Sequence, residues 1–184
     1  TGTERCMAIS VPVPVGEKVA DELMERMVPL VKKLPVGPPS DSSVAMGPVI
    51  TKQSLERITA LLQSGVNQGA KLLVDGRSLK VPGHENGFFI GASLFDQVTP
   101  EMEIYKEEIF GPVLSSVRVS DYEEAIKLIH NNQYANGVAI FTRDGDAARD
   151  FVNRIEVGMV GVNVPIPVPV GYHSFGGWKK SLFG

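Results

Sequence analysis

Val113-Leu114-Ser115-Ser116-Val117-Arg118-Val119 runs directly into Ser120-Asp121-Tyr122-Glu123, and this junction decides the fold class. The first stretch mixes β-branched residues with serines, which favours a strand over residues 113–119. The second stretch places a glutamate three residues after a serine. This capping box predicts a helix whose buried face carries Ala125, Ile126 and Ile129. A strand that leads into a helix is the repeating unit of an α/β protein.

The alternation of strands and helices continues downstream. Residues 137–142 and 158–164 have the composition of strands, and residues 144–155 between them have the period of a helix. The apolar face of that helix carries Ala148, Phe151, Val152 and Ile155. The order predicts an α/β fold with a mostly parallel sheet flanked by helices.

The first half contains similar elements. Residues 7–15 are expected to form an edge or irregular strand, because Pro12 and Pro14 cannot donate to a strand ladder. An amphipathic helix follows, in which Pro29 predicts a kink or break near residue 28. The expected buried face of this helix comprises Val19, Leu23, Met27, Leu30, Val31 and Leu34.

Loops, a second helix and two short strands complete this half. Residues 35–43 are rich in glycine, proline and serine, as is typical of a loop. A helix is predicted over residues 54–68, with Thr51 as its cap candidate. Strands are predicted at 71–74 and 88–94. The apolar face of the helix carries Leu55, Ile58, Leu61 and Leu62.

The composition is that of an ordinary globular protein. The 184 residues are 43% hydrophobic and 21% charged, and this length fits one domain. A net charge of -3 provides no electrostatic footprint for nucleic acid or an anionic membrane, so neither partner is expected. The single cysteine excludes an internal disulfide framework and favours a reducing compartment, so we expect a cytoplasmic protein, or a mitochondrial matrix protein in a eukaryote.

Cys6 is the first candidate for chemistry. A lone thiol beside Arg5 is a plausible nucleophile, because nearby positive charge favours the reactive thiolate. The alternative is a buried cysteine that acts as a small hydrophobic residue.

Two further stretches are unusual. In Glu107-Glu108-Ile109-Phe110-Gly111-Pro112, a carboxylate could accept both hydroxyls of a ribose and the aromatic ring could lie against a planar ring. The alternative is a solvated charge pair with one core phenylalanine. In residues 162–171, the alternate prolines Pro165, Pro167 and Pro169 exclude a helix or an interior strand, which leaves a rigid pocket wall or an ordered loop or edge.

Taken together, these residues resemble the catalytic domain of an aldehyde dehydrogenase, and the resemblance covers nearly the whole chain. Within that superfamily, Arg5-Cys6-Met7-Ala8 and residues 161–169 resemble the CoA-acylating enzymes that act on methylmalonate or malonate semialdehyde. The motifs occur in the expected order: residues 1–8 around Cys6, Met46-Gly47-Pro48-Val49-Ile50, Gly87-Phe88-Phe89-Ile90, residues 107–113 and Ser174-Phe175-Gly176-Gly177-Trp178-Lys179-Lys180-Ser181.

The resemblance implies a role for each site residue. Cys6 would attack the aldehyde carbon, and its own backbone N–H would help to stabilise the oxyanion. Glu108 would bind the nicotinamide ribose of NAD, and Phe110 would pack near the nicotinamide. Phe175 would line the aldehyde channel. The resulting thioacyl enzyme would lose carbon dioxide and pass its acyl group to CoA.

The resemblance also implies that the parent enzyme is longer. Residues 1–184 would be the catalytic domain, without the NAD-binding domain that precedes the cysteine in the family and without the closing oligomerisation strand. We therefore expect the chain to be inactive by itself, with the NAD-binding domain of the same parent chain as a partner and a homo-oligomer as the parent assembly. Departures from the family pattern at Ala92, Ser174 and Leu182 bear on the shape of the channel.

Three alternatives remain open. A cysteine hydrolase would need a histidine base, and none of His84, His130 and His173 can be assigned that role or a metal-ligand spacing. The second alternative is an aldehyde dehydrogenase domain that hydrolyses its acyl enzyme. The third is an inactive folded or oligomerisation fragment.

Overall fold

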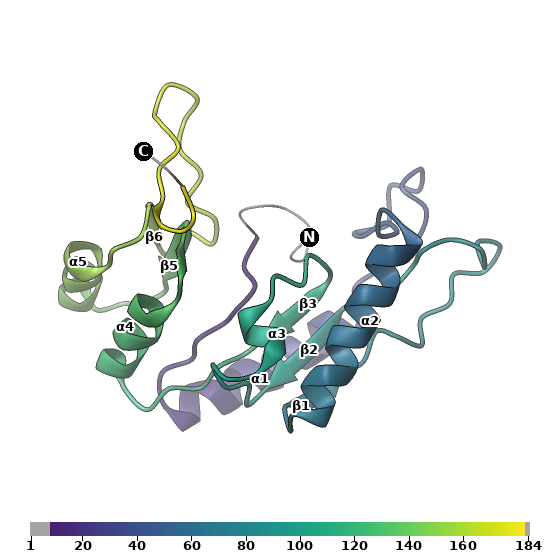
Figure 1. Cartoon of the computed structure of the whole chain (residues 1–184), viewed down its shortest axis with the longest axis horizontal. Helices are drawn as coiled ribbons and strands as arrows, with labels where there is room; N and C mark the ends of the chain where they lie inside the picture. Colours follow the sequence, from purple (N-terminus) through teal and green to yellow (C-terminus); the bar gives the residue numbers. More distant parts are fainter. Residues whose placement is uncertain (1–7, 183–184) are drawn as a thin grey trace. The chain divides into compact units, whose positions relative to one another are not determined.

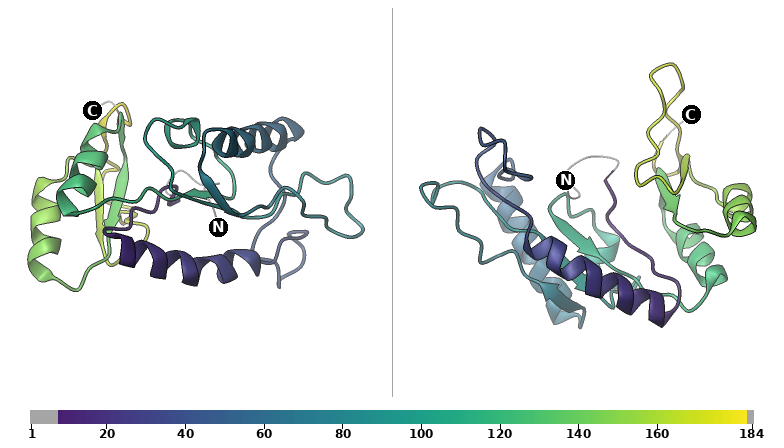
Figure 2. Two further views of the ribbon diagram at one scale, coloured as in Figure 1. Left: turned by 90° about the horizontal axis from the view of Figure 1, so that it is seen from below. Right: turned by 180° about the vertical axis from the view of Figure 1, so that it is seen from behind.

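The computed structural model describes residues 8–182 of the chain, and these residues fall into two compact units, which are divided between Ser120 and Asp121. Figures 1 and 2 show the helices and strands of each unit. Each unit has its own buried apolar cluster. The units are therefore described one at a time.

The first unit is built on a three-stranded sheet. Strands β1 (Lys71–Val74), β2 (Ser93–Asp96) and β3 (Val113–Ser115) lie in the order β1-β2-β3, with β1 antiparallel and β3 parallel to β2. The bounds of β1 agree with the sequence prediction. The sheet is mixed because one neighbour of β2 runs in each direction.

An irregular extended segment lies beside the chain that follows β3. The amides of Val117 and Val119 donate to the carbonyls of Pro12 and Pro14, at 3.0 and 3.2 Å. A proline carbonyl can accept, but a proline nitrogen has no hydrogen to donate. The expected edge or irregular strand is therefore confirmed over its described residues.

Two long helices cover opposite faces of this sheet, α1 (Glu17–Lys32) and α2 (Lys52–Asn67) (Figure 2). Successive strand residues point to opposite faces. Leu94 accordingly packs in a cluster with Met24 of α1, whereas Phe95 approaches Gly65 of α2 so closely that a Cβ there would lie 3.2 Å from the Phe95 ring. A short helix, α3 (Glu103–Lys106), precedes β3.

The start of α2 confirms the predicted cap. The Thr51 side chain accepts a hydrogen bond of 3.1 Å from the Ser54 amide, so the helix begins at Lys52, two residues before the predicted start. Of the predicted apolar face, Ile58, Leu61 and Leu62 are buried.

Helix α1 differs from its prediction in two ways. It continues through Pro29 without a break, because the proline lies in the last turn and removes only one helical hydrogen bond. Its buried stripe includes Ala20 and Met24, whereas Val19 and Leu30 are 54% and 69% exposed. Leu23, Met27 and Val31 of the predicted face pack, partly buried, against the core cluster. The prediction is therefore confirmed for these three residues and wrong for Val19 and Leu30.

Strand β2 lies further along the chain than predicted. It spans Ser93–Asp96 instead of residues 88–94, and all four of its residues are buried. A buried aspartate is rare without a partner. Here the Arg118 guanidinium donates to both carboxylate oxygens of Asp96, at 3.0 and 2.6 Å, and it also pairs with Glu17 and Asp21 of α1. This ion pair allows the strand to include a buried charged residue.

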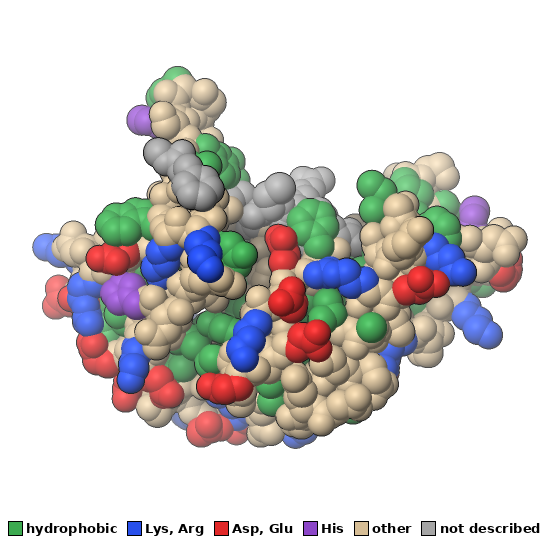
Figure 3. Space-filling model, viewed as in Figure 1, with side chains coloured by type: hydrophobic (Ala, Val, Ile, Leu, Met, Phe, Trp, Pro, Cys, Tyr) green, Lys and Arg blue, Asp and Glu red, His purple; other side chains and the backbone are tan. Residues whose placement is uncertain are grey.

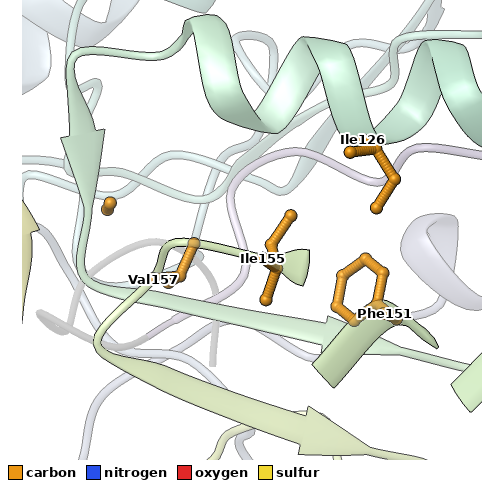
Figure 4. Packing of buried hydrophobic residues seen from close by; sticks show 5 residues of the cluster. Ile126, Phe151, Ile155 and Val157 are labelled. Atoms are coloured by element: carbon orange, nitrogen blue, oxygen red, sulfur yellow. The ribbon is translucent and has the colours of Figure 1, made fainter. Parts of the chain in front are cut away.

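The second unit combines two helices with two strand pairs. The helices are α4 (Tyr122–Asn131) and α5 (Gly145–Arg154). Strands β5 (Gly137–Ile140) and β6 (Met159–Val162) pair in parallel, and β4 (Tyr134–Ala135) pairs antiparallel with β7 (Trp178–Lys179). Figure 4 shows Ile126 of α4 and Phe151 of α5 facing each other in the core, with Ile155 and Val157 beside them.

Several predictions need correction here. The α4 cap is Asp121, whose Oδ1 accepts from the Glu124 amide at 2.9 Å, and not the preceding serine. Val152 is 46% exposed, because the α5 stripe that meets the core is centred on Phe151. The β4–β7 pair was not predicted, and β3, β5 and β6 are shorter than their predicted ranges.

The α/β class itself is confirmed. Both units combine helices with strands. The β2–β3 and β5–β6 pairs are parallel, but β1–β2 and β4–β7 are antiparallel, so the strand pairing is mixed and not mostly parallel as predicted. Among the helices of the described part of the chain, none is long and apolar enough to cross a membrane.

Candidate active site

The candidate site residues fall in three places. Cys6 lies outside the described residues 8–182. Glu108 and Phe110 lie in the first unit, in the loop of residues 107–112 between α3 and β3, here called the Glu108 loop. Phe175 lies in the second unit, in the loop of residues 163–177 between β6 and β7, here called the Phe175 loop.

The Glu108 loop is fixed at both of its ends. The Glu107 amide donates to the Glu103 carbonyl at 2.8 Å and continues the turn of α3. At the other end, the Pro112 carbonyl accepts from the Ser93 amide at 2.8 Å, which ties the loop to β2. Ile109 is buried between these two anchors.

Burial of Ile109 leaves its two neighbours facing solvent. Glu108 is exposed, and Phe110 is 46% exposed. Phe110 has a φ of 51°, in the left-handed region that bulky side chains rarely adopt. The loop therefore presents a carboxylate and an aromatic ring one residue apart. Phe110 is therefore not the core phenylalanine of the structural alternative.

Helix α2 supports the loop from one side. Arg57 donates from Nη1 to the Ile109 carbonyl at 2.7 Å and from Nη2 to the Glu108 carbonyl. One residue further along the helix, Ile58 touches Gly111 so closely that a Cβ on the glycine would lie 2.6 Å from Ile58 Cδ1. Two consecutive residues of α2 thus hold the backbone that carries Glu108 and Phe110.

Arg57 is not among the residues predicted from the sequence, and no local pattern could have revealed it. Its carbonyl partners lie 51 and 52 residues away in the chain. An arginine on the polar side of an amphipathic helix is usually a solvated surface residue.

An open depression of about 250 Å³ lies beside this loop. It is lined by Arg57, Ala60, Leu61, Glu103 and Glu107. Figure 3 shows acidic and basic side chains next to each other over this part of the first unit. Because both signs of charge are present, the depression has no clear preference for an anion or a cation.

The Phe175 loop begins where β6 ends. Asn163 has a φ of 56°, and its side-chain amide accepts from the Thr142 amide and donates to the Thr142 carbonyl, both at 3.0 Å. The chain then continues through the alternate prolines without forming a helix or strand, as predicted. Phe175 is 49% exposed, and several further apolar side chains are exposed along the loop, including Val164, Ile166, Val168 and Val170.

The far end of the Phe175 loop is anchored through polar contacts. Lys179 donates from Nζ to the carbonyls of Ile129, His130 and Asn132 at 3.3, 2.7 and 2.9 Å, which caps the C-terminus of α4 with a positive charge. Ser181 Oγ accepts from the Ala135 amide at 2.8 Å.

Gly158 is a second residue that the sequence analysis missed. A Cβ at Gly158 would lie 2.3 Å from the Gly176 carbonyl oxygen and 2.6 Å from Gly177 Cα. The available signal was a glycine at the start of a predicted strand together with a Gly-Gly pair, since glycine in a strand often marks a close backbone approach.

The ion pair between Asp96 and Arg118 shifts the pKa values of both of its members. Burial raises the pKa of Asp96, but the hydrogen bonds from Arg118 and from the Gln97 amide outweigh burial and hold that pKa below its usual value. The same pair raises the pKa of Arg118. In the second unit, burial and a hydrogen bond to Asp150 raise the pKa of Tyr122 to about 12. These groups stabilise the structure and lie outside both candidate loops.

Within the described range 8–182, no group of three or more metal-ligating side chains is found. His84 lies edge-on to Phe89, His130 Nε2 is 3.2 Å from the Arg154 carbonyl, and His173 packs against Tyr172. The three histidines thus occupy ordinary structural positions.

Comparison with known proteins places these features in a family context. A family model for the aldehyde dehydrogenase family matches residues 2–184. The malonate-semialdehyde dehydrogenase of Pseudomonas aeruginosa is 62% identical over 181 residues, which cover 98% of this chain and 36% of that protein. The mitochondrial methylmalonate-semialdehyde dehydrogenase [acylating] of Arabidopsis thaliana is 51% identical, over 98% of this chain and 30% of that protein.

A solved structure shows the same likeness in three dimensions. It is that of a protein from Sinorhizobium meliloti 1021 assigned as a methylmalonate-semialdehyde dehydrogenase and complexed with NAD. The two chains are 63% identical and superpose with a TM-score of 0.97, over 100% of this chain and 37% of that one. The chain thus spans about a third of the length of these relatives.

Proposed function

The chain belongs to the aldehyde dehydrogenase family, and from this membership we propose that it is the catalytic-cysteine portion of an NAD-dependent, CoA-acylating malonate or methylmalonate semialdehyde dehydrogenase. The observation that carries the proposal is the 62% identity to a malonate-semialdehyde dehydrogenase over 98% of the chain. The word "acylating" in the name of the Arabidopsis relative supports transfer of the acyl group to CoA instead of water.

The Glu108 loop fits the nicotinamide end of NAD. A ribose offers two neighbouring hydroxyl donors, and the exposed Glu108 carboxylate can accept both. The exposed ring of Phe110 can cover one face of a planar aromatic group. When bound, NAD would accept a hydride from the substrate carbon.

The remaining chemistry belongs to Cys6. Its thiolate attacks the aldehyde carbon, so a carbon–sulfur bond forms and the carbonyl π electrons move to oxygen. The Cys6 backbone N–H donates to that oxyanion. Loss of hydride and return of the electron pair from oxygen leave a thioester on Cys6. The carbon–carbon bond to the substrate carboxylate then breaks, carbon dioxide leaves, and the electron pair forms a thioester enolate that takes up a proton from water. Attack by the CoA thiol on the thioester carbonyl transfers the acyl group to CoA and regenerates the Cys6 thiol.

Phe175 would line the channel through which the aldehyde reaches Cys6. Its ring is half exposed on a loop whose backbone is restricted by prolines on one side and by the Lys179 and Ser181 anchors on the other. A restricted loop keeps an aromatic wall in place without a cost in conformational entropy when substrate binds.

The proposal extends to partners and location. Contacts to the pyrophosphate and adenosine of NAD would come from a dinucleotide-binding domain of the same parent chain, because neither candidate loop contains a phosphate-binding motif. The exposed apolar side chains of the Phe175 loop support a homo-oligomer as the working form. The single cysteine supports a reducing compartment, the cytoplasm or the mitochondrial matrix.

The test uses the natural polypeptide that carries this sequence. NADH formation is followed with malonate semialdehyde and with methylmalonate semialdehyde, in the presence and absence of CoA, and products are identified by mass spectrometry. We expect acetyl-CoA or propionyl-CoA from the wild-type protein, and no covalent acyl enzyme from Cys6→Ala with an unchanged circular dichroism spectrum. Free acid as the product with CoA present would refute the acylating proposal. Full turnover by Cys6→Ala would refute the role of the thiol.

A further inference from the structure

We infer that Arg57 is a positioning residue for the nicotinamide end of the site, an inference that rests on the function proposed above. Arg57 lies on the exposed side of α2 and carries a full positive charge, but both of its hydrogen bonds described above go to backbone carbonyl oxygens of the Glu108 loop. It therefore acts on the loop backbone that carries Glu108 and Phe110.

The two carbonyls that Arg57 holds define the loop conformation. The Glu108 carbonyl belongs to the peptide plane between residues 108 and 109, and the Ile109 carbonyl belongs to the next plane. Because a peptide group is planar, holding its oxygen restricts the rotation of the whole group. The planes on both sides of Ile109 are thus restricted together, and with them the directions in which Glu108 and Phe110 leave the backbone.

The conformation of Phe110 makes such support necessary. Its φ of 51° is uncommon for a bulky residue, and such conformations persist when the surroundings enforce them. Burial of Ile109 and the bond from Ser93 to Pro112 locate the loop. Neither contact directly fixes the orientation of the Glu108 carbonyl, whereas Arg57 does.

An arginine suits this task better than a lysine. The guanidinium presents N–H groups in a planar, rigid fork, and here Nη1 and Nη2 each reach one of two consecutive carbonyls. A lysine ammonium is a single point charge on a flexible stem. We expect Arg57→Lys to retain part of the effect and Arg57→Met, which keeps much of the apolar stem, to lose it.

Removal of Arg57 should change geometry more than stability. The bond to the Glu108 carbonyl is exposed and the bond to the Ile109 carbonyl is only partly buried, so water can reach both carbonyls once Arg57 is removed. We therefore expect Arg57→Met to keep a near-wild-type melting temperature. A small displacement of a positioned group can still reduce a rate greatly, so kcat/KM for NAD should fall by roughly 10- to 100-fold, with the KM for the semialdehyde nearly unchanged.

The experiment compares Arg57→Met, Arg57→Lys and the control Lys52→Met in the natural polypeptide. Lys52 is an exposed cation of the same helix that pairs only weakly with Glu56, at 3.6 Å. The expected order of kcat/KM for NAD is wild type and Lys52→Met first, then Arg57→Lys, and Arg57→Met last. Equal values for Arg57→Met and Lys52→Met would overturn the inference. A lower melting temperature of Arg57→Met together with similar increases in the KM for NAD and the KM for the semialdehyde would also overturn it.

A second measurement separates this inference from the proposed function. Hydrogen exchange of peptides that cover residues 107–113 reports on the loop whether or not the protein oxidises an aldehyde. Faster exchange in Arg57→Met than in Lys52→Met supports the inference that Arg57 restrains the loop backbone. Equal exchange in the two variants overturns that inference. If the wild-type protein shows no NAD-dependent oxidation, the proposed function fails while the exchange result still decides the role of Arg57 in the loop.

Discussion

Replacement of Gly111 by alanine tests how closely the Glu108 loop is pressed against α2. The new Cβ would lie 2.6, 2.8 and 3.3 Å from the Cδ1, Cγ1 and Cγ2 atoms of Ile58. Favourable contacts between carbon atoms lie near 3.5–4.0 Å. Ile58 is only 1% exposed and is surrounded by core, so the strain cannot be relieved by turning its side chain into solvent.

The size of the effect follows from this geometry. The loop and helix must separate by about 1 Å, and overpacking of this kind typically costs about 1–3 kcal/mol. The helix is the more rigid partner, because Leu61 and Leu62 anchor it in the core. The loop backbone next to Phe110 therefore moves, and we expect kcat/KM for NAD to fall along with the free energy of unfolding.

A second substitution makes the prediction specific. Ile58→Val removes Cδ1, the nearest clashing atom, and by itself should cost about 0.5–1.5 kcal/mol. Combined with Gly111→Ala it should relieve part of the overpacking. The double variant should therefore lose less free energy of unfolding than the sum of the two single losses, by at least about 0.5 kcal/mol. Gly145→Ala serves as the control, because a Cβ at Gly145 would meet nothing within 4 Å.

Urea unfolding followed by circular dichroism measures the four variants and the wild type. Additive costs of Gly111→Ala and Ile58→Val would refute the contact between this loop and the helix. A loss of stability in Gly145→Ala as large as that in Gly111→Ala would show that the backbone, and not the contact with Ile58, determines the cost.

Four further predictions concern the supporting structure. At pH 7, Arg118→Met should cost about 3–5 kcal/mol and Asp96→Asn less, because only the former leaves a buried carboxylate without its cation, and equal costs in urea unfolding would contradict this. The pKa of Asp96 is lowered by folding, so its contribution is present above the unfolded value of about 4 and is lost as the pH falls through the lower folded value. Between pH 7 and pH 3 the wild type should therefore lose more stability than Asp96→Asn. Gly158→Ala should cost about 3 kcal/mol or more, because its Cβ would meet backbone atoms that cannot rotate away, and a wild-type unfolding curve would exclude this packing. Lys179→Met should cost about 1 kcal/mol through loss of the cap on α4, whereas Lys180→Met, which loses a single contact to a glutamine side chain, should be close to neutral in the same assay.

The candidate residues illustrate which parts of the site could be anticipated. Glu108 and Phe110 belong to a short, continuous motif, so their local pattern is visible in the sequence. The role of Phe175 is implied only by the resemblance to the aldehyde dehydrogenase family. The structure adds that Ile109 is buried and that its neighbours face solvent. The roles of Glu108, Phe110, Phe175 and Cys6 in catalysis stay predictions that the experiments above address.

By itself the sequence determined what depends on neighbours within one or two helical turns. The Thr51 cap, the bounds of β1 and the succession of β5, α5 and β6 follow from side-chain period, capping and turn chemistry, which act over about four residues.

Only the tertiary structure decided what depends on segments that meet across the chain. Asp96 belongs to a buried strand because Arg118 reaches it from 22 residues away, and the Glu108 loop is held by Arg57 from 51 residues away. The short β4–β7 pair joins residues more than 40 positions apart. The free energy of such contacts is gained only when the folded chain brings both partners together. The sequence around either partner alone therefore does not predict the contact.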